Sequence, residues 1–347
     1  MPFEIYDTLT LAEVIRVQKP PTTYWLDNFF PRTITFETEE ILFDVVVEDR
    51  RLAPFVSPNV QGRVMREIGY STKSFRPAYV KPKHVVTPQR AVPRMAGEAI
   101  TGAMSLQEKY NALVAYNMGL EKDQVMRRWD WMAAQAVINS SVTVEGDDYP
   151  SVTVDFGRDP SLSVQLTGAA LWSSATAKPI QDIENLRAKI FNLSRQPVNR
   201  LTFGLEAWTA FSENPEIVLL LNKFYSGSDS VYNRSVGVMG PYEFRGSLSG
   251  QNGMGQLDLW TYNDFYEDDF RNTVPYMDPT TVVLTGPGLQ GVRTFGAIMD
   301  RAAGLVTVDM FPKMWFTEDP STTYTMTQSA PLMIPAQPNG SGVLKVV

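Results

Sequence analysis

Apolar side chains recur at helical spacing between about residues 117 and 139, where Met126, Trp129 and Ala133 fall on one face and the charged side chains lie mostly off it. Such a stripe is typical of a helix that packs one side against a core. The pattern predicts one long helix here, preceded by a separate helical segment near residues 105–117.

Other stretches alternate or are continuously apolar, as expected for strands. Apolar and polar residues alternate within residues 141–167, around turn signals, and TVVLTG at 281–286 is typical of a buried strand. Residues 179–224 combine an amphipathic helix, a strand and two helical pieces broken at Pro215. Two further strands are expected near the C-terminus, in YTMTQSAPLMIP and VLKVV.

The N-terminal segment has a short helical pattern and then the stretch PPTTYWLDNFFPRT at residues 20–33. Its three prolines block regular structure, so the stretch is expected to be an extended arm. An arm without a core of its own must anchor its aromatic rings elsewhere, for example on another subunit. The anchoring residues are Trp25, Phe29 and Phe30.

Charge switches sign sharply after this arm. Residues 36–49 hold six acidic and no basic side chains, whereas residues 50–94 hold ten basic side chains against one acidic one. That basic window carries +9, while the whole chain carries −7 and the rest therefore −16. The window is consistent with a long two-stranded excursion, which is marginal alone and needs a surface to lie on. Nucleic acid could supply that surface, but we favour an acidic surface on another copy of the same chain.

Composition removes several kinds of chemistry. The apolar and charged fractions are those of a globular chain, and the apolar cluster IVLLL at 217–221 is too short to span a bilayer, so a soluble protein is expected. The chain has no cysteine and one histidine, His84, which nearly excludes a zinc site. His84 lies between lysines, with no carboxylate or nucleophile nearby in sequence. A structural or interfacial role is therefore favoured over catalysis.

Two further motifs bear only a superficial likeness to a cation site and to a phosphate-binding loop. The acidic stretch NDFYEDDF could offer oxygen ligands to calcium or magnesium, but it lacks the EF-hand spacing and reads better as a solvated loop. The glycines of GPGLQG at 286–291 match no phosphate-loop pattern, and Pro287 removes one backbone donor. No cofactor is expected.

Three ordered motifs resemble the major capsid proteins of lambda-like tailed bacteriophages. They are FVSPNVQGRVMREIGYSTKSFRPAYVKPKHVVTPQ at 55–89, TVVLTGPGLQGVRTFGAIMD at 281–300 and PKMWFTEDPSTTYTMTQSAPLMIP at 312–335. The middle of the chain, about 140–280, matches mainly in the order of its elements. The alternatives are an encapsulin-type nanocompartment shell and, more distantly, a hydrolase with an unrecognised carboxylate pair.

The resemblance implies an α+β chain with the Hong Kong 97-type capsid fold. It implies the following divisions: N-terminal arm 1–40, E-loop 41–98, peripheral domain 99–175 with the spine helix at about 117–139, axial domain 176–300, a return through the peripheral domain at 301–330, and final axial strands at 331–347.

The resemblance also implies a non-enzymatic function: self-assembly as hexamers and pentamers into the icosahedral head shell around double-stranded DNA. The implied partners are copies of itself, a decoration protein, a separate scaffolding protein and a portal at one vertex. The packaged DNA is enclosed without specific binding, and no membrane, metal or covalent crosslink is implied. The shell would be assembled in the host cytoplasm. The residues expected at inter-subunit contacts are Trp25, Phe29, Phe30, Arg63, Arg66, Lys73, Arg76, Lys81, Lys83 and His84.

Overall fold

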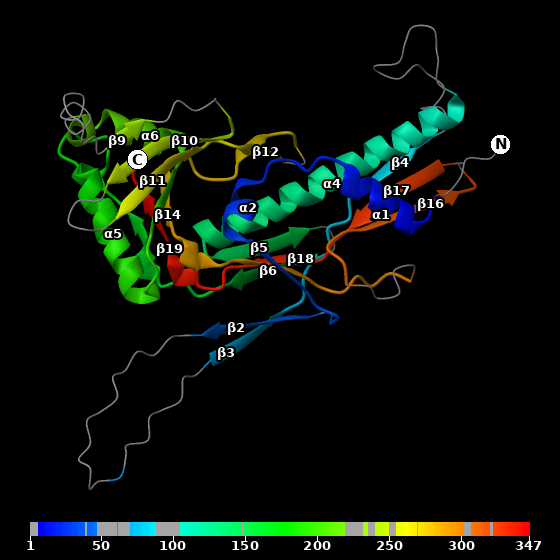
Figure 1. Cartoon of the computed structure of the whole chain (residues 1–347), viewed down its shortest axis with the longest axis horizontal. Coiled ribbons are helices and arrows are strands. Elements are labelled where there is room, and N and C mark those ends of the chain that lie inside the picture. The colour runs from blue at the N-terminus through cyan, green and yellow to red at the C-terminus, as the bar shows by residue number, and fades with distance from the viewer. Residues whose placement is uncertain are drawn as a thin grey trace.

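The computed structural model describes residues 6–38, 40–46, 61, 70–87, 105–146, 149–218, 232–234, 240–249, 255–268, 270–301, 307–319 and 322–347. Figure 1 shows a sheet with helices at one end, a long helix running away from it, and a hairpin that projects from the body.

The long helix is α4, Leu106–Ile138, which is about 50 Å long at 1.5 Å per residue. It is one continuous helix, so the predicted break near residue 117 is wrong; no proline interrupts it. At its start Ser105 and Glu108 form a capping box. At its end the Arg158 guanidinium donates to the carbonyl oxygens of Val137 and Ile138, at 3.0 and 2.7 Å.

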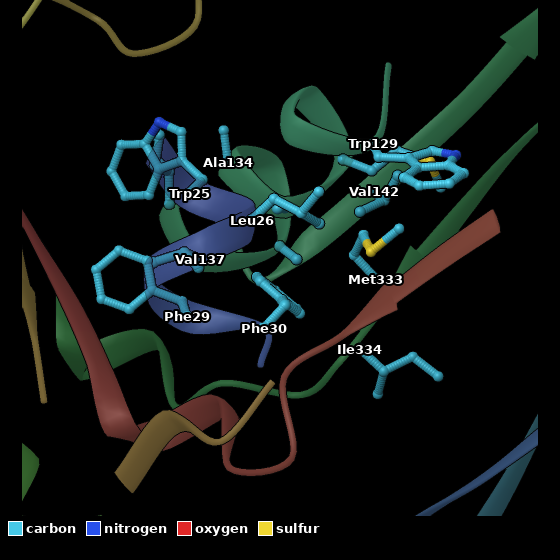
Figure 2. Close-up of a cluster of buried hydrophobic side chains, with 14 of the residues drawn as sticks. Trp25, Leu26, Phe29, Phe30, Trp129, Ala134, Val137, Val142, Met333 and Ile334 are labelled. Carbon is cyan, nitrogen blue, oxygen red and sulfur yellow. The ribbon is translucent and has the colours of Figure 1, made fainter. Parts of the chain in front are cut away.

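The N-terminal segment contains the short helix that its pattern predicted, and a second helix where the stretch PPTTYWLDNFFPRT was expected to be extended. It forms α1, Thr8–Val17, and α2, Tyr24–Phe29. The prolines lie outside both helices, so they bound α2 and do not prevent it. Helix α2 packs on α4, and its rings enter the main core of the chain (Figure 2).

Seven strands form the sheet at one end of the molecule, in the order β7-β19-β14-β8-β11-β10-β9. Helices α5, Pro179–Ser194, and α6, Leu205–Glu213, pack on it around a second core. The strands are β7, Ser163–Gln165; β8, Arg200–Phe203; β9, Tyr232–Arg234; β10, Tyr242–Ser249; β11, Gln256–Tyr262; β14, Thr281–Thr285; and β19, Ser341–Lys345.

Smaller sheets surround α4. Strand β17 pairs on one side with β16 and on the other with β4, while β15 pairs with β1 and β18, and β5 pairs with β6. Strands β12 and β13 form a short hairpin. The bounds are β1, Arg32–Thr35; β4, Lys83–Val86; β5, Ser141–Gly146; β6, Tyr149–Asp155; β12, Phe265–Glu267; β13, Thr273–Pro275; β15, Val292–Phe295; β16, Phe311–Thr317; β17, Thr322–Gln328; and β18, Pro331–Ile334.

The projecting hairpin joins β2, Ile41–Val46, to β3, Tyr70–Phe75, in antiparallel register. Ile41 and Phe75 are buried where it meets the body. Strand β4 lies within the expected E-loop range of 41–98 and pairs with β17 in another sheet. Likewise β18 pairs with β15, so within 331–347 it is β19 that joins the seven-stranded sheet.

Candidate assembly surfaces

Strand β4 places Lys83 and His84 on opposite sides of one sheet. His84 lies opposite Thr325 and Lys83 opposite Met326 of β17. Since successive side chains of a strand point to opposite faces, Lys83 and Val85 are exposed while His84 faces α4. The two kinds of residue therefore have different roles.

His84 joins a buried polar cluster on α4. Its Nδ1 lies 3.4 Å from Oε1 of Glu121, a side chain with no exposed surface. The same carboxyl accepts hydrogen bonds from the hydroxyls of Thr325 and Thr327, at 2.6 and 2.8 Å. Burial raises the pKa of Glu121, and these hydrogen bonds and His84 partly offset that rise.

This cluster holds β4 and β17 against α4 and does not resemble a catalytic triad. Both threonine hydroxyls donate to Glu121, so neither is presented to the imidazole as a nucleophile. Sequence reasoning missed Glu121. The available signal was a carboxylate on the same helical stripe as Met118 and Val125, both buried.

The outward face of this sheet is aromatic and basic. The rings of Trp315 and Tyr324 stack at 5.5 Å, and the Lys83 ammonium lies 3.9 Å from the Tyr324 centroid and 5.0 Å from that of Trp315. Lys81 lies 4.5 Å from the centroid of Tyr79 in the same way. These cation–π contacts hold two positive charges at the surface.

The other predicted basic contact residues are only partly described. Arg76 follows β3 and is exposed, and its carbonyl oxygen accepts a hydrogen bond from the Tyr149 hydroxyl at 2.9 Å. Lys73 lies opposite Phe43 in the β2–β3 register. Arg63 and Arg66 lie outside the described residues.

The three aromatic residues expected at a subunit contact lie in the core of their own chain. Trp25 and Phe30 have no exposed surface and Phe29 is buried. The Trp25 ring packs at 5.8 Å from Phe29 and 5.3 Å from Tyr262. The expected contact with another subunit is therefore corrected: these three side chains pack in the core of their own chain, under α2.

The glycines of GPGLQG serve close packing. A Cβ on Gly286 would overlap the carbonyl oxygen of Pro197, and one on Gly291 would overlap the Phe30 ring. Only glycine fits where the chain approaches this closely. The acidic stretch contains β12, after which the Asp268 carboxylate accepts hydrogen bonds from the backbone N–H groups of Phe270 and Asn272. Over the described ranges, no three His, Asp or Glu side chains converge in a way that could hold a metal.

Comparison with known proteins agrees with this geometry. The family described as "Phage major capsid protein E" matches residues 7–346. The chain is 30% identical over 335 residues to the major capsid protein of Enterobacteria phage P21, with 93% of each chain covered. It is 29% identical over 321 residues to the major capsid protein of Escherichia phage lambda, with 91% of each covered. The crystal structure of a putative capsid protein of a prophage of E. coli CFT073 matches with a TM-score of 0.76 at 22% identity, over 99% of this chain and 100% of that one.

The fold defines an α+β capsid protein of the Hong Kong 97 type, as the sequence motifs implied. The chain belongs to the phage major capsid protein E family. Its function is that of a shell protein in a multi-subunit phage capsid, and this family is a structural class, not a class of enzymes. The encapsulin alternative is not favoured, because the sequence relatives over nearly the whole chain are phage capsid proteins. Among the described helices, none has both the length and the apolar character to cross a membrane.

Proposed function

We propose that this chain assembles as hexamers and pentamers into the icosahedral head shell of a lambda-like tailed phage, around double-stranded DNA and with a portal at one vertex. Assembly takes place in the host cytoplasm. The observation that carries the proposal is the family match across residues 7–346, together with a fold that covers the full length of a prophage capsid protein.

In this shell the β2–β3 hairpin reaches over an adjacent copy. A two-stranded ribbon is marginal in water unless it lies on a surface, and this one projects from its own body (Figure 1). The basic side chains proposed at the contact are Arg63, Arg66, Lys73, Arg76, Lys81, Lys83 and His84. Lys81 and Lys83 are the best candidates, because both are exposed, whereas His84 is engaged by Glu121.

The further partners are a separate scaffolding protein and a decoration protein that reinforces the shell. Packaged DNA is enclosed without specific binding, which the net charge of −7 supports because a negative surface does not attract phosphates. Strong binding of DNA by the isolated subunit that weakens steeply with salt would contradict this.

Electron microscopy of the protein, expressed with and without its neighbouring genes and separated by size, tests the proposal. Closed shells or capsomer rings are expected. A denaturing gel of the same particles should show the monomer band without a ladder, since no covalent crosslink is proposed. A monodisperse monomer in the presence of the neighbouring genes would overturn the shell proposal, and a ladder would overturn only the statement on crosslinks.

A further inference from the structure

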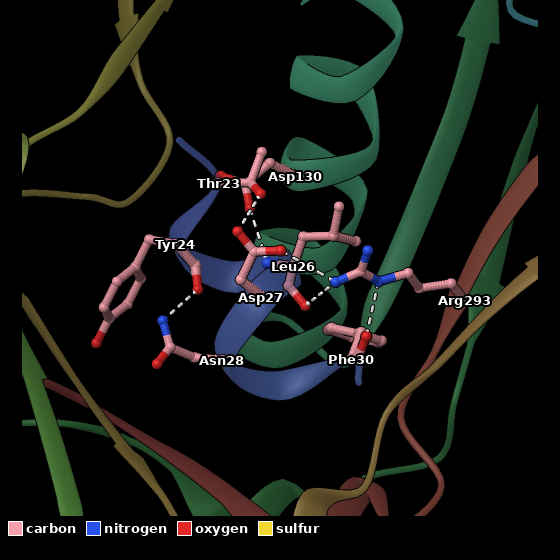
Figure 3. Close-up of polar contacts among 8 residues, drawn as sticks. All are labelled: Thr23, Tyr24, Leu26, Asp27, Asn28, Phe30, Asp130 and Arg293. Carbon is pink, nitrogen blue, oxygen red and sulfur yellow. Dashed lines mark hydrogen bonds and ion pairs between the residues drawn. The ribbon is translucent and has the colours of Figure 1, made fainter. Parts of the chain in front are cut away.

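Helix α2 is only six residues long, and charged side chains from two other elements hold both of its ends (Figure 3). On α4, Oδ1 of Asp130 accepts the backbone N–H of Leu26 at 2.8 Å. On β15, the Arg293 guanidinium donates to the carbonyl oxygens of Phe30 and Leu26, at 2.7 and 3.1 Å. The arrangement complements the partial charges at the two helix ends.

Asp130 and Arg293, which bind the two ends of α2, differ in whether an opposite charge lies beside them. Arg293 is part-exposed and forms an ion pair with Asp27 at 3.1 Å. Asp130 is 3% exposed, and the described part of the chain offers it no ion pair. A buried carboxylate that lacks a cation is costly to ionise.

The groups that face Asp130 add to this cost. Asp27 of α2 and Asp264, which follows β11, both act on it as like charges. The hydroxyls of Tyr262 on β11 and Tyr276 after β13 are also close enough to sense its charge, and the nearby cation on α4, Arg127, acts on Tyr276. Within the described part of the chain, the groups around Asp130 that favour its ionised form are the backbone N–H groups of α2.

We propose that the docking of α2 on α4 is controlled by the protonation of Asp130, with the helix held more tightly when this carboxyl is neutral. A neutral carboxyl keeps a carbonyl oxygen that can accept the Leu26 N–H, and it avoids the buried charge. Because α2 carries Trp25 and Phe30 into the core, loosening it opens the contact between the N-terminal segment and the long helix. The device is a property of the single chain and does not depend on the shell.

The direction of the pH dependence follows from linkage. Burial raises the pKa of Asp130 to about 7, from an ordinary value of 3.8. Undocking of α2 would return water to this carboxyl and lower its pKa toward the ordinary value. Between these values the docked state keeps a proton that the undocked state releases. Docking therefore weakens about tenfold for each unit of rising pH in this window, and the dependence levels off above about pH 7.

Hydrogen exchange of the full chain between pH 5 and pH 8.5 tests the proposal. Protection factors of the α2 amides, corrected for intrinsic exchange and referred to the β14 amides, should fall about 50-fold from pH 5 to pH 7 and only about twofold more by pH 8.5. Asp130→Asn keeps an acceptor oxygen but cannot ionise, so its α2 protection should be independent of pH. A flat profile in the parent chain, or the same slope in D130N, would overturn the proposal.

A second variant keeps the test decisive if D130N does not fold. Asp264→Asn removes one of the like charges beside Asp130 and retains an oxygen for the Phe265 N–H. The fall in α2 protection should then level off at a lower pH than in the parent chain. A levelling point that does not move would mean that the titrating group is not Asp130 in this cluster, and the proposal would fail.

Discussion

Helix α2 and the β2–β3 hairpin are close in sequence, with only β1 between them, and both were expected to contact another subunit. Each lies in a stretch without an obvious core of its own. In the structure, α2 lies against α4 with its aromatic rings in the main core, whereas the hairpin projects from the body, with Ile41 and Phe75 buried where the two meet.

The two segments differ in the free energy that their side chains can gain by burial in a core. Trp25, Leu26 and Phe30 each bury their whole side chain, and apolar burial contributes roughly 25 cal/mol per Å². Each strand of the hairpin carries one charged side chain, Asp44 in β2 and Lys73 in β3, and the segments that flank the strands are acidic before residue 50 and basic after it. Charges gain little from a core but can recognise a complementary surface. In this chain the aromatic segment packs on its own core, whereas the segregated charge is the basis on which we propose a partner surface for the hairpin.

Trp25→Ala should have the largest effect. Removing a ring with no exposed surface leaves a cavity between Phe29 and Tyr262, and the free energy of unfolding should fall by about 3–5 kcal/mol. Urea unfolding of the isolated subunit measures this. An α2 that served mainly as a subunit contact would give the opposite result: unchanged unfolding with lost assembly.

The matched control is Leu9→Ala on α1, because Leu9 is 74% exposed. Its free energy of unfolding should stay within about 0.5 kcal/mol of the parent value. Equal losses in both variants would show that any truncation in the N-terminal segment destabilises the subunit, and the distinction between the two regions would lose its basis.

The sequence predicted elements well where periodicity was long or strongly apolar. The helical character of α4 and the fully buried strand β14 were both predicted, because a long helix and five consecutive buried side chains give clear patterns, although α4 was predicted as two segments. Helix α2 was missed, since six residues between prolines are too short for periodicity and its stability comes from tertiary packing. Glu121 and Asp130 were missed as well, because their partners lie about 100 to 200 residues away.

Glu121→Ala should have the second largest effect. It leaves the buried hydroxyls of Thr325 and Thr327 without their acceptor, which should lower the free energy of unfolding by about 2–4 kcal/mol. Glu121→Gln should stay within about 1 kcal/mol, because its amide can still bond the hydroxyls. Chemical denaturation at neutral pH measures both; equal losses would mean that the site needs a charge and not a hydrogen-bond acceptor.

The same pair of variants has a pH signature. Because burial raises the pKa of Glu121, the folded parent chain holds a proton that the unfolded chain has released. Stability of the parent should therefore fall as pH rises above the ordinary value of 4.5, until the folded-state pKa is passed. The contribution of this site to the slope should vanish in E121Q. An unchanged slope would assign the pH dependence to other groups, with Asp130 the first to test.

The smallest effect on stability, with the largest on assembly, is expected for the double variant Lys81→Glu, Lys83→Glu. The cation–π contacts it removes are surface contacts of about 0.5–1 kcal/mol each, so the subunit should remain folded by circular dichroism. If both lysines face an acidic surface of another copy, reversing their sign should lower the yield of shells several-fold.

Lys81→Gln, Lys83→Gln is the matched control, because it removes the same ring contacts without adding repulsion. A larger loss from reversal than from neutralisation, and one that added salt reduces, would identify an electrostatic subunit contact. Equal yields from both variants and the parent would remove these lysines from the contact and leave β2–β3 as the surface to examine.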